Sequence, residues 1–270
     1  MIDNRKMIDN SSNNGFLYSA FGEKYVKEAL ISAKSLKAVD STADVTIVSD
    51  QQVNHVEFDR KVEHKLQSNE PWKSGLVGKI DALMESPYEK TVFLDSDTYI
   101  VSPINELFKL LDYFDLCLAM APADISPVEI DGIKLEGLNC YNTGLIAYRK
   151  NKKVIRFLEN WRNDYLENFD QYNGHQASFM KVFALSDIQV HVLQQHYNTR
   201  TNLAIALPGA PAKVIHNRHK NYTAVTQRIN KRIGNRIWDP VLQDVINLGP
   251  SITPLKMAMQ CLKRIIRGYQ

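Results

Sequence analysis

The chain has 270 residues, of which 44% are hydrophobic and 23% are charged. A chain of this length can bury a substantial core, and its ordinary composition excludes a disordered chain. The sequence shows no internal repeat of the solenoid kind. Its apolar stretches are too short to cross a bilayer as helices, which excludes an integral helical membrane protein.

Charge is unevenly distributed along the chain, although the formal net charge is only +3. Residues 217–270 hold ten Lys or Arg and two Asp or Glu, a net charge of +8, so residues 1–216 carry −5. A basic segment behind an acidic body predicts contact with an anionic surface. Cys117, Cys140 and Cys261 are an odd, scattered set, which favours a reducing compartment. Together with a polar N-terminus that lacks a signal-peptide core, this predicts a cytoplasmic protein.

Strand and helix patterns alternate along the first two thirds of the chain. Strands are predicted at 16–21, 44–49, within 54–72, and at 91–94, 116–120, 145–148, 188–193 and 213–216. Helices are predicted at 25–36, 74–85, 152–168 and 176–183, and a loop at 122–138. Such alternation predicts an α/β fold with a mostly parallel central sheet flanked by helices. Ligands of such sheets bind beyond the carboxyl ends of the strands.

The domain organisation is predicted from the spacing of these elements. Residues 1–14 are expected to form a flexible N-terminus. Residues 15–235 are expected to form one domain, because no segment rich in Gly, Ser or Pro divides them. Residues 236–270 are expected to form a basic, helical C-terminal appendage.

A pair of aspartates follows the strand predicted at 91–94. Asp95 and Asp97 are separated by one residue, so in extended backbone their carboxylates project to the same side and can hold one ion. Mn²⁺ and Mg²⁺ prefer such oxygen ligands. Aspartates in turns often bond to nearby backbone instead, and the motif alone leaves this alternative open. The position directly after a buried strand favours the metal site.

The segment FLDSDTYIV, residues 93–101, resembles the donor-site segment of glycogenin-like retaining glycosyltransferases, which have the GT-A fold. Further similar segments follow the family's order, so the resemblance covers roughly residues 16–220. They are the opening strand and helix at 18–36, Lys79 on the helix before the aspartates, and the segments 142–144, 174–176 and 214–216. The resemblance implies a nucleotide-diphospho-sugar transferase fold of the GT-A type.

The resemblance also implies a set of functional residues. The metal ligands are Asp95, Asp97 and His216. The donor-binding residues are Tyr25, which packs on the uracil, Lys79, Asp95, Ser96, Asp97, Asn142, His175, Gln176 and Lys220. The catalytic residues are Lys79, Asn142 and Gln176. Each residue also has a structural alternative, for example a core aromatic for Tyr25, a solvated helix lysine for Lys79 and a structural histidine for His216.

Two positions depart from the family pattern. His175 stands where relatives have an aspartate implicated in sugar recognition or catalysis, so the sugar and the mechanism stay open. After His216 the family has a glycine and a lysine that close over the phosphates. Here the run is Asn217-Arg218-His219-Lys220, so either Lys220 or Arg218 is expected to supply that cation.

The function implied by the resemblance is metal-dependent transfer of a hexose-type sugar from a UDP-sugar to a glycan or a lipid-linked glycan. Mn²⁺ or Mg²⁺ stabilises the charge that develops on the departing diphosphate. Retention is expected, with the leaving group acting as the base, whereas inversion would need a base such as one within residues 122–138. An inactive nucleotide-sugar or glycan-binding protein is a second reading, which His175 favours. A sugar-phosphate nucleotidyltransferase is a third, but residues 19–22 lack its Gly-rich loop with an Arg.

The tail pattern predicts a further partner. In residues 255–270 apolar side chains share one helical face, and the four basic side chains lie elsewhere without any acidic residue. Such a helix within residues 251–270 is expected to lie on an anionic membrane surface, at its inner face, or else to dock on the domain. Nucleic acid is not expected as a partner, because no recognised module is present and the body is acidic.

Overall fold

The computed structural model describes residues 14–66, 71–121, 128–130, 132–135, 137–170, 172, 175–207 and 209–248, together with residues 258, 259 and 262. The predictions for the N-terminal 13 residues and for most of 251–270 lie outside this part. Within the described part, no helix combines the length and hydropathy that crossing a bilayer requires.

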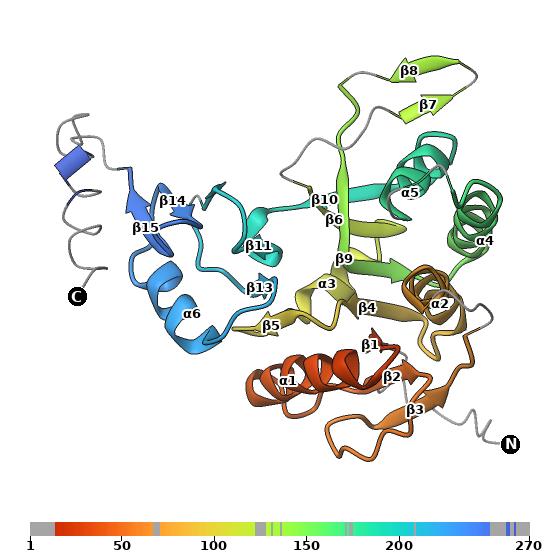
Figure 1. Ribbon diagram of the computed structural model, residues 1–270, viewed down its shortest axis with the longest axis horizontal. Helices are drawn as coiled ribbons and strands as arrows, with labels where there is room; N and C mark the ends of the chain where they lie inside the picture. The colour runs from red at the N-terminus through yellow and green to blue at the C-terminus, as the bar shows by residue number, and fades with distance from the viewer. Residues whose placement is uncertain are drawn as a thin grey trace, which may run out of the picture.

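A seven-stranded sheet with the order β10-β6-β9-β4-β1-β2-β3 forms the centre of the molecule (Figure 1). Its strands are β1 (Asn14–Ser19), β2 (Val45–Ser49), β3 (Arg60–Glu63), β4 (Lys90–Leu94), β6 (Leu116–Met120), β9 (Tyr141–Arg149) and β10 (Val190–Leu193). All neighbouring pairs are parallel except those of β9, which runs antiparallel to β4 and β6. The mostly parallel sheet is therefore confirmed. The amino end of β9 lies at the same edge as the carboxyl ends of the other strands.

Helices cover both faces of this sheet (Figure 1). One face packs on α1 (Glu23–Val39) and α3 (Glu106–Leu110), and the other on α2 (Pro71–Glu85), α4 (Lys152–Glu167) and α5 (His175–Ala184). In β4, Val92 and Leu94 enter the first core and Phe93 enters the second. A strand buried on both faces needs apolar residues at every position, which explains its unbroken apolar run.

A second unit, built from β5 and from the residues after β10, packs around its own small core. Its elements are β5 (Thr98–Ile100), β11 (Thr199–Arg200), β12 (Ile205–Ala206), β13 (Val214–His216), α6 (Tyr222–Asn230), β14 (Arg236–Asp239) and β15 (Asp244–Asn247). β5 pairs with β13, and β12 pairs with β14. The buried Arg236 guanidinium donates to the carbonyls of Ile229, Leu207, Gly234 and Ala210. Residues 236–247 are thus strands within this unit, which differs from the helical appendage expected there.

Two other segments differ from the sequence-based expectations. The segment expected as a loop at 122–138 contains a hairpin of β7 (Val128–Ile130) and β8 (Ile133–Leu135), with the turn glycine Gly132 at a φ of 78°. β9 spans nine residues rather than the four expected, so Asn142-Thr143-Gly144 lies inside a strand. The sequence pattern did not predict the beginning of this strand, because Asn and Gly are weak strand formers.

Candidate metal and donor site

The two aspartates lie in a turn that joins β4 to β5. The Asp95 N–H donates to the Gly144 carbonyl at 2.8 Å, and both the N–H and the hydroxyl of Thr98 donate to the Asp95 carbonyl. The aspartates therefore lie in a turn rather than in the extended backbone expected, and these turn bonds use the backbone of Asp95 and leave the carboxylates to the site. Because β5 then pairs with β13, Thr98 lies opposite His216. This pairing brings a histidine from a distant part of the sequence beside the turn.

Asp95, Asp97 and His216 form a compact set of ligand atoms. One carboxylate oxygen of each aspartate and a ring nitrogen of the histidine lie within 4.8 Å of one another. His216 Nε2 is 3.3 Å from Asp97 Oδ1 and 3.9 Å from Asp95 Oδ2. Two carboxylates and an imidazole are a donor set that suits Mn²⁺ and other divalent ions.

Gly144 provides the space that the histidine ring occupies. A Cβ at this position would lie 2.0 Å from His216 Cε1, so any side chain would displace the ring. The glycine of the Asn-Thr-Gly segment is therefore required by close packing against the ring of His216. Gly144 thus lets the His216 ring lie beside the two carboxylates, and the resulting set of ligand atoms fits a divalent ion.

Asp97 is ionised over the whole neutral range. Burial by itself raises the pKa of its carboxyl group. The contact with His216, together with the charge of Arg218, outweighs burial and holds the pKa of Asp97 at about 2. The residue is therefore an anion at any pH at which a metal would bind.

Lys79 lies behind the first aspartate and is almost fully buried. Its ammonium group donates to Asp95 Oδ1 at 2.7 Å and to the Thr143 carbonyl at 2.8 Å, and it lies 4.8 Å from the centroid of the Phe93 ring. The second oxygen of Asp95 is the one that faces His216. Lys79 thus orients the Asp95 carboxylate, and it is placed beside the metal ligands rather than on the open surface.

Asn142 is also buried, and its side-chain oxygen is engaged within the protein. It accepts from the Gly144 N–H and from the side-chain amide of Asn198, both at 3.0 Å. Asn198 in turn contacts His216 Nδ1 at 2.6 Å. Asn198 has no signal in the sequence, because it belongs to no recognised segment and lies outside the predicted elements.

The open side of the metal ligands is bordered by α1 and by the segment that follows β13. Tyr25 on α1 is 37% exposed, which leaves part of its ring accessible. Arg218 lies 5.8 Å from the Tyr25 centroid and 3.8 Å from Asp97 Oδ2. Two of its nitrogens donate to the Glu28 carboxylate at 2.7 and 2.9 Å, and Ser96 Oγ donates to the same carboxylate at 3.3 Å. Glu28, which the sequence did not single out, therefore joins α1 to both segments of the site.

The remaining predicted residues lie around the same edge of the sheet. Gln176 in the first turn of α5 donates through Nε2 to the Tyr141 carbonyl, so it ties this helix to the beginning of β9. Lys220 is exposed in the segment between β13 and α6. The side chain of His175 and residues 122–127 lie outside the described part of the chain.

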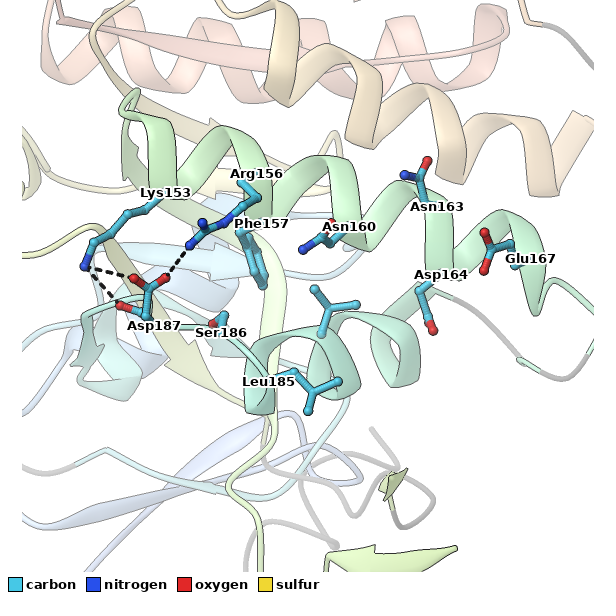
Figure 2. A pocket seen from close by; sticks show the side chains of 11 residues that line it. Lys153, Arg156, Phe157, Asn160, Asn163, Asp164, Glu167, Leu185, Ser186 and Asp187 are labelled. Atoms are coloured by element: carbon cyan, nitrogen blue, oxygen red, sulfur yellow. Dashed lines mark hydrogen bonds and ion pairs between the residues drawn. The ribbon is translucent and has the colours of Figure 1, made fainter. Parts of the chain in front are cut away.

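A hollow runs between α4 and α5, and its Asp187 end lies at the opposite edge of the sheet. Figure 2 shows Lys153 and Arg156 reaching from α4 to Asp187, with which both form ion pairs. Asp187 precedes the amino end of β10, and α4 follows the carboxyl end of β9, which pairs with the amino end of β4. This end of the hollow therefore lies away from the carboxyl ends of the parallel strands, where Asp95, Asp97 and His216 converge.

Comparisons with known proteins give a fold but no sequence family. No family model and no curated protein matches the sequence. The glycosyltransferase GlyE of Streptococcus pneumoniae TIGR4 is similar in structure, with a TM-score of 0.53 and 15% identity over 77% of this chain and 55% of that chain. The galactosyltransferase LgtC, in complex with donor and acceptor sugar analogues, gives a TM-score of 0.52 and 12% identity over 76% of this chain and 87% of that chain.

An active-site mutant of LgtC is also similar, with a TM-score of 0.52 and 15% identity over 80% of this chain and 94% of that chain. The chain thus spans little more than half of GlyE and most of LgtC. At such identities, structural likeness establishes the fold and leaves activity to be argued from the site. The chain has the GT-A fold.

Proposed function

We propose that this chain is a metal-dependent glycosyltransferase that transfers a hexose-type sugar from a UDP-sugar to a glycan or lipid-linked glycan, with retention. The observation that carries the proposal is the convergence of Asp95, Asp97 and His216 at the carboxyl-end edge of a GT-A sheet. Ligands of open α/β sheets bind at this edge. The names of the structural neighbours, both glycosyltransferases, support the same reaction class.

The protein's part in metal binding follows from the site geometry. Asp95, Asp97 and His216 would hold Mn²⁺ or Mg²⁺, and Lys79 would keep Asp95 oriented. When bound, the ion would supply Lewis-acid stabilisation of the negative charge on the diphosphate.

The donor is proposed to extend from Tyr25 to the metal ligands. The partly exposed ring of Tyr25 offers a face on which a uracil can stack, and Arg218 lies between this ring and Asp97. A guanidinium there would meet the diphosphate, for which planar paired donors are well suited. Of the two cations left open by the sequence, Arg218 is therefore the better placed, whereas Lys220 has no described contact with a site residue.

The chemical step is proposed to need no protein nucleophile. The acceptor hydroxyl would attack the anomeric carbon from the face on which the diphosphate departs, and a diphosphate oxygen would take its proton. The protein would then contribute orientation and electrostatic stabilisation. Gln176 is proposed to face the donor sugar, because its amide anchors α5 beside Asn142.

A binding protein without turnover is the second candidate, and His175 is the residue that favours it. A thermal-shift screen of UDP, GDP, CDP and dTDP, each with and without Mn²⁺, tests the donor site, because a ligand of the native state raises the melting temperature. The proposal expects a shift with UDP that requires Mn²⁺. Metal-dependent hydrolysis of a UDP-sugar without acceptor would then identify an enzyme. Binding without hydrolysis or transfer would favour the second candidate, and no shift with any nucleotide would contradict the donor site.

We also propose that residues 251–270 attach the protein to an anionic membrane surface at its cytoplasmic side. The support is their basic, amphipathic pattern. A chain without these residues should sediment less with anionic liposomes and hydrolyse the donor as well as the full chain. Equal sedimentation of both chains would contradict the attachment.

A further inference from the structure

We infer that Asn198 is a positioning residue that fixes the imidazole of His216 in one tautomer, with hydrogen on Nδ1 and a lone pair on Nε2. The inference depends on the proposed function only where it concerns a metal ion. Asn198, Asn142 and His216 are 1%, 7% and 6% exposed, so water does not compete for their hydrogen bonds. The three side chains form one continuous relay that begins at the backbone of Gly144.

The backbone end of the relay determines the direction of every bond in it. A peptide N–H can only donate, so the Asn142 atom 3.0 Å from Gly144 N is the amide oxygen. The same oxygen lies 3.0 Å from the Asn198 side chain and can only accept there, so the Asn198 atom is the amide nitrogen. The oxygen of Asn198 is then the atom 2.6 Å from His216 Nδ1. Because that oxygen carries no hydrogen, Nδ1 must donate one.

The relay leaves the other ring nitrogen available as a ligand. A neutral imidazole carries one hydrogen, so placing it on Nδ1 gives Nε2 a free lone pair. This lone pair faces Asp97 Oδ1 at 3.3 Å and Asp95 Oδ2 at 3.9 Å. Two carboxylate oxygens and a ring nitrogen with a lone pair thus face one another, which is a set of atoms that a divalent cation can bind. A hydrogen bond between a neighbouring residue and the ring nitrogen that does not bind the metal orients such a histidine and raises its affinity for the metal.

The fold positions Asn198 through strand pairing. The residue lies between the short 3₁₀ helix η1 (Gln195–Tyr197) and β11, and β11 pairs with β13 so that Arg200 lies opposite His216. Gly144 links the relay to the turn of the aspartates, because its N–H begins the relay and its carbonyl accepts from the Asp95 N–H. A primary amide is required at position 198, since it presents an acceptor to the ring and a donor to Asn142 at once.

The test measures the tautomer directly in the metal-free protein. Long-range ¹H–¹⁵N correlation spectra in mildly alkaline buffer distinguish the two neutral forms, and His216→Asn assigns the signal. The wild type is expected to show hydrogen on Nδ1. Asn198→Leu should lose this preference, and its Mn²⁺ affinity without nucleotide, measured by calorimetry, should fall about 10- to 100-fold. Hydrogen on Nε2 in the wild type would overturn the inference.

Two further variants separate positioning from a structural role. Asn198→Asp keeps an acceptor for Nδ1, so the tautomer should be retained even if the link to Asn142 is lost. Asn202→Leu changes an exposed asparagine four residues along and should leave tautomer and Mn²⁺ affinity unchanged. Unaltered Mn²⁺ binding by a folded Asn198→Leu variant would contradict the positioning role. A wild type with hydrogen on Nδ1 that binds no divalent ion would keep the relay and refute the metal-dependent function instead.

Discussion

Asp97 and Asp115 lie at opposite edges of the central sheet, and both carboxyl groups are largely buried. In both, burial raises the pKa of the carboxyl group, and partners outweigh burial so that the pKa is lowered overall. A lowered pKa therefore does not distinguish the two residues. The chemistry of their neighbours does.

Asp115 is surrounded by groups that can only donate. Its Oδ1 accepts from Arg149 at 3.0 Å and from Asn151 at 2.7 Å, and its Oδ2 accepts from the Gln189 N–H at 3.1 Å. Asp97 instead faces a ring nitrogen that can itself bind a cation, and its guanidinium neighbour is 3.8 Å away. The first arrangement joins three segments of the fold, whereas the second forms a set of ligands. The predictions below test this division, from the largest expected effect to the smallest.

Replacing Asp115 should produce the largest change in stability. Asp115→Ala leaves the Asn151 amide and the Gln189 N–H without the buried carboxylate that accepts from them, and Asn151 also caps α4 through Val154 N at 2.9 Å. The free energy of unfolding should fall by about 3 kcal/mol, because several partly buried donors lose one acceptor together. Urea unfolding measures this loss, and Mn²⁺ affinity should stay at the wild-type value. A fall in metal affinity in a folded variant would mean that the two edges are coupled.

Acid pH provides a second measurement on the same variant. Because the pKa of Asp115 is lowered in the folded state, its contribution to stability is present above the ordinary carboxyl pKa and is lost as pH falls below it. The stability difference between wild type and Asp115→Ala should therefore be largest near neutral pH and shrink in acid. A difference that is constant with pH would show that packing, rather than charge, accounts for the effect.

Replacing Asp97 should lower the affinity for Mn²⁺, which Asp115→Ala is expected to leave unchanged. Asp97→Asn removes one anionic ligand, and the affinity for Mn²⁺, with or without UDP, should fall at least about 100-fold, or about 2.7 kcal/mol. The melting temperature of the metal-free protein should also fall, because the lowered pKa of Asp97 means that its partners stabilise the carboxylate in the folded state, so affinity is compared at a temperature at which both proteins are folded. Asp187→Asn at the opposite edge is the matched control and should leave binding unchanged. Mn²⁺-dependent UDP binding that survives in Asp97→Asn would refute the site.

The sequence predicted which three candidate ligands converge better than it predicted the residues that orient them. Asp95 and Asp97 follow a recognisable buried strand, and His216 ends another, so alternation and resemblance were enough to propose them. The motif left open whether the aspartates lie in a turn, because the answer depends on the pairing of β5 with β13 across a large sequence separation. Asn198 was missed because a buried amide has no local pattern.

The same limit explains the errors in the second unit. Its strands are two to four residues long, too short for a periodic pattern to emerge. Arg236 looked like part of a basic tail, yet it is buried and satisfied by four carbonyl groups that only the folded chain brings together. A charge count cannot separate such a residue from a solvated one.

Arg218 and Lys220 are the two cations proposed to contact the diphosphate, and replacing each in turn shows which of them does so. Arg218→Ala should weaken Mn²⁺-dependent UDP binding about tenfold, because it removes the guanidinium held between Tyr25 and Asp97. Lys220→Ala is the matched change of a nearby exposed cation and should have less than a threefold effect. Calorimetry with UDP in saturating Mn²⁺ measures both. The reverse order of effects would assign the diphosphate to Lys220.

Backbone strain gives the smallest predicted effect and again concerns the site edge. Asn217 follows the third ligand with a φ of 130°, in a region that favours glycine, and its N–H donates to the Asp97 carbonyl at 3.0 Å. Such a conformation costs on the order of 1–3 kcal/mol, and the extra freedom of glycine in the unfolded chain offsets part of the relief. Asn217→Gly should therefore raise the free energy of unfolding by about 1 kcal/mol.

The control for this variant is Gln243→Gly, at the other non-glycine residue with a positive φ in the described chain. Its φ of 48° lies in the left-handed helical region that ordinary residues tolerate better, so its stability should change less. If Asn217→Gly proves stabilising while Mn²⁺ affinity falls, the strain at Asn217 holds the turn of Asp97 in its ligand geometry. If stability falls instead, the Asn217 side chain must itself stabilise the segment after β13 by more than the strain costs.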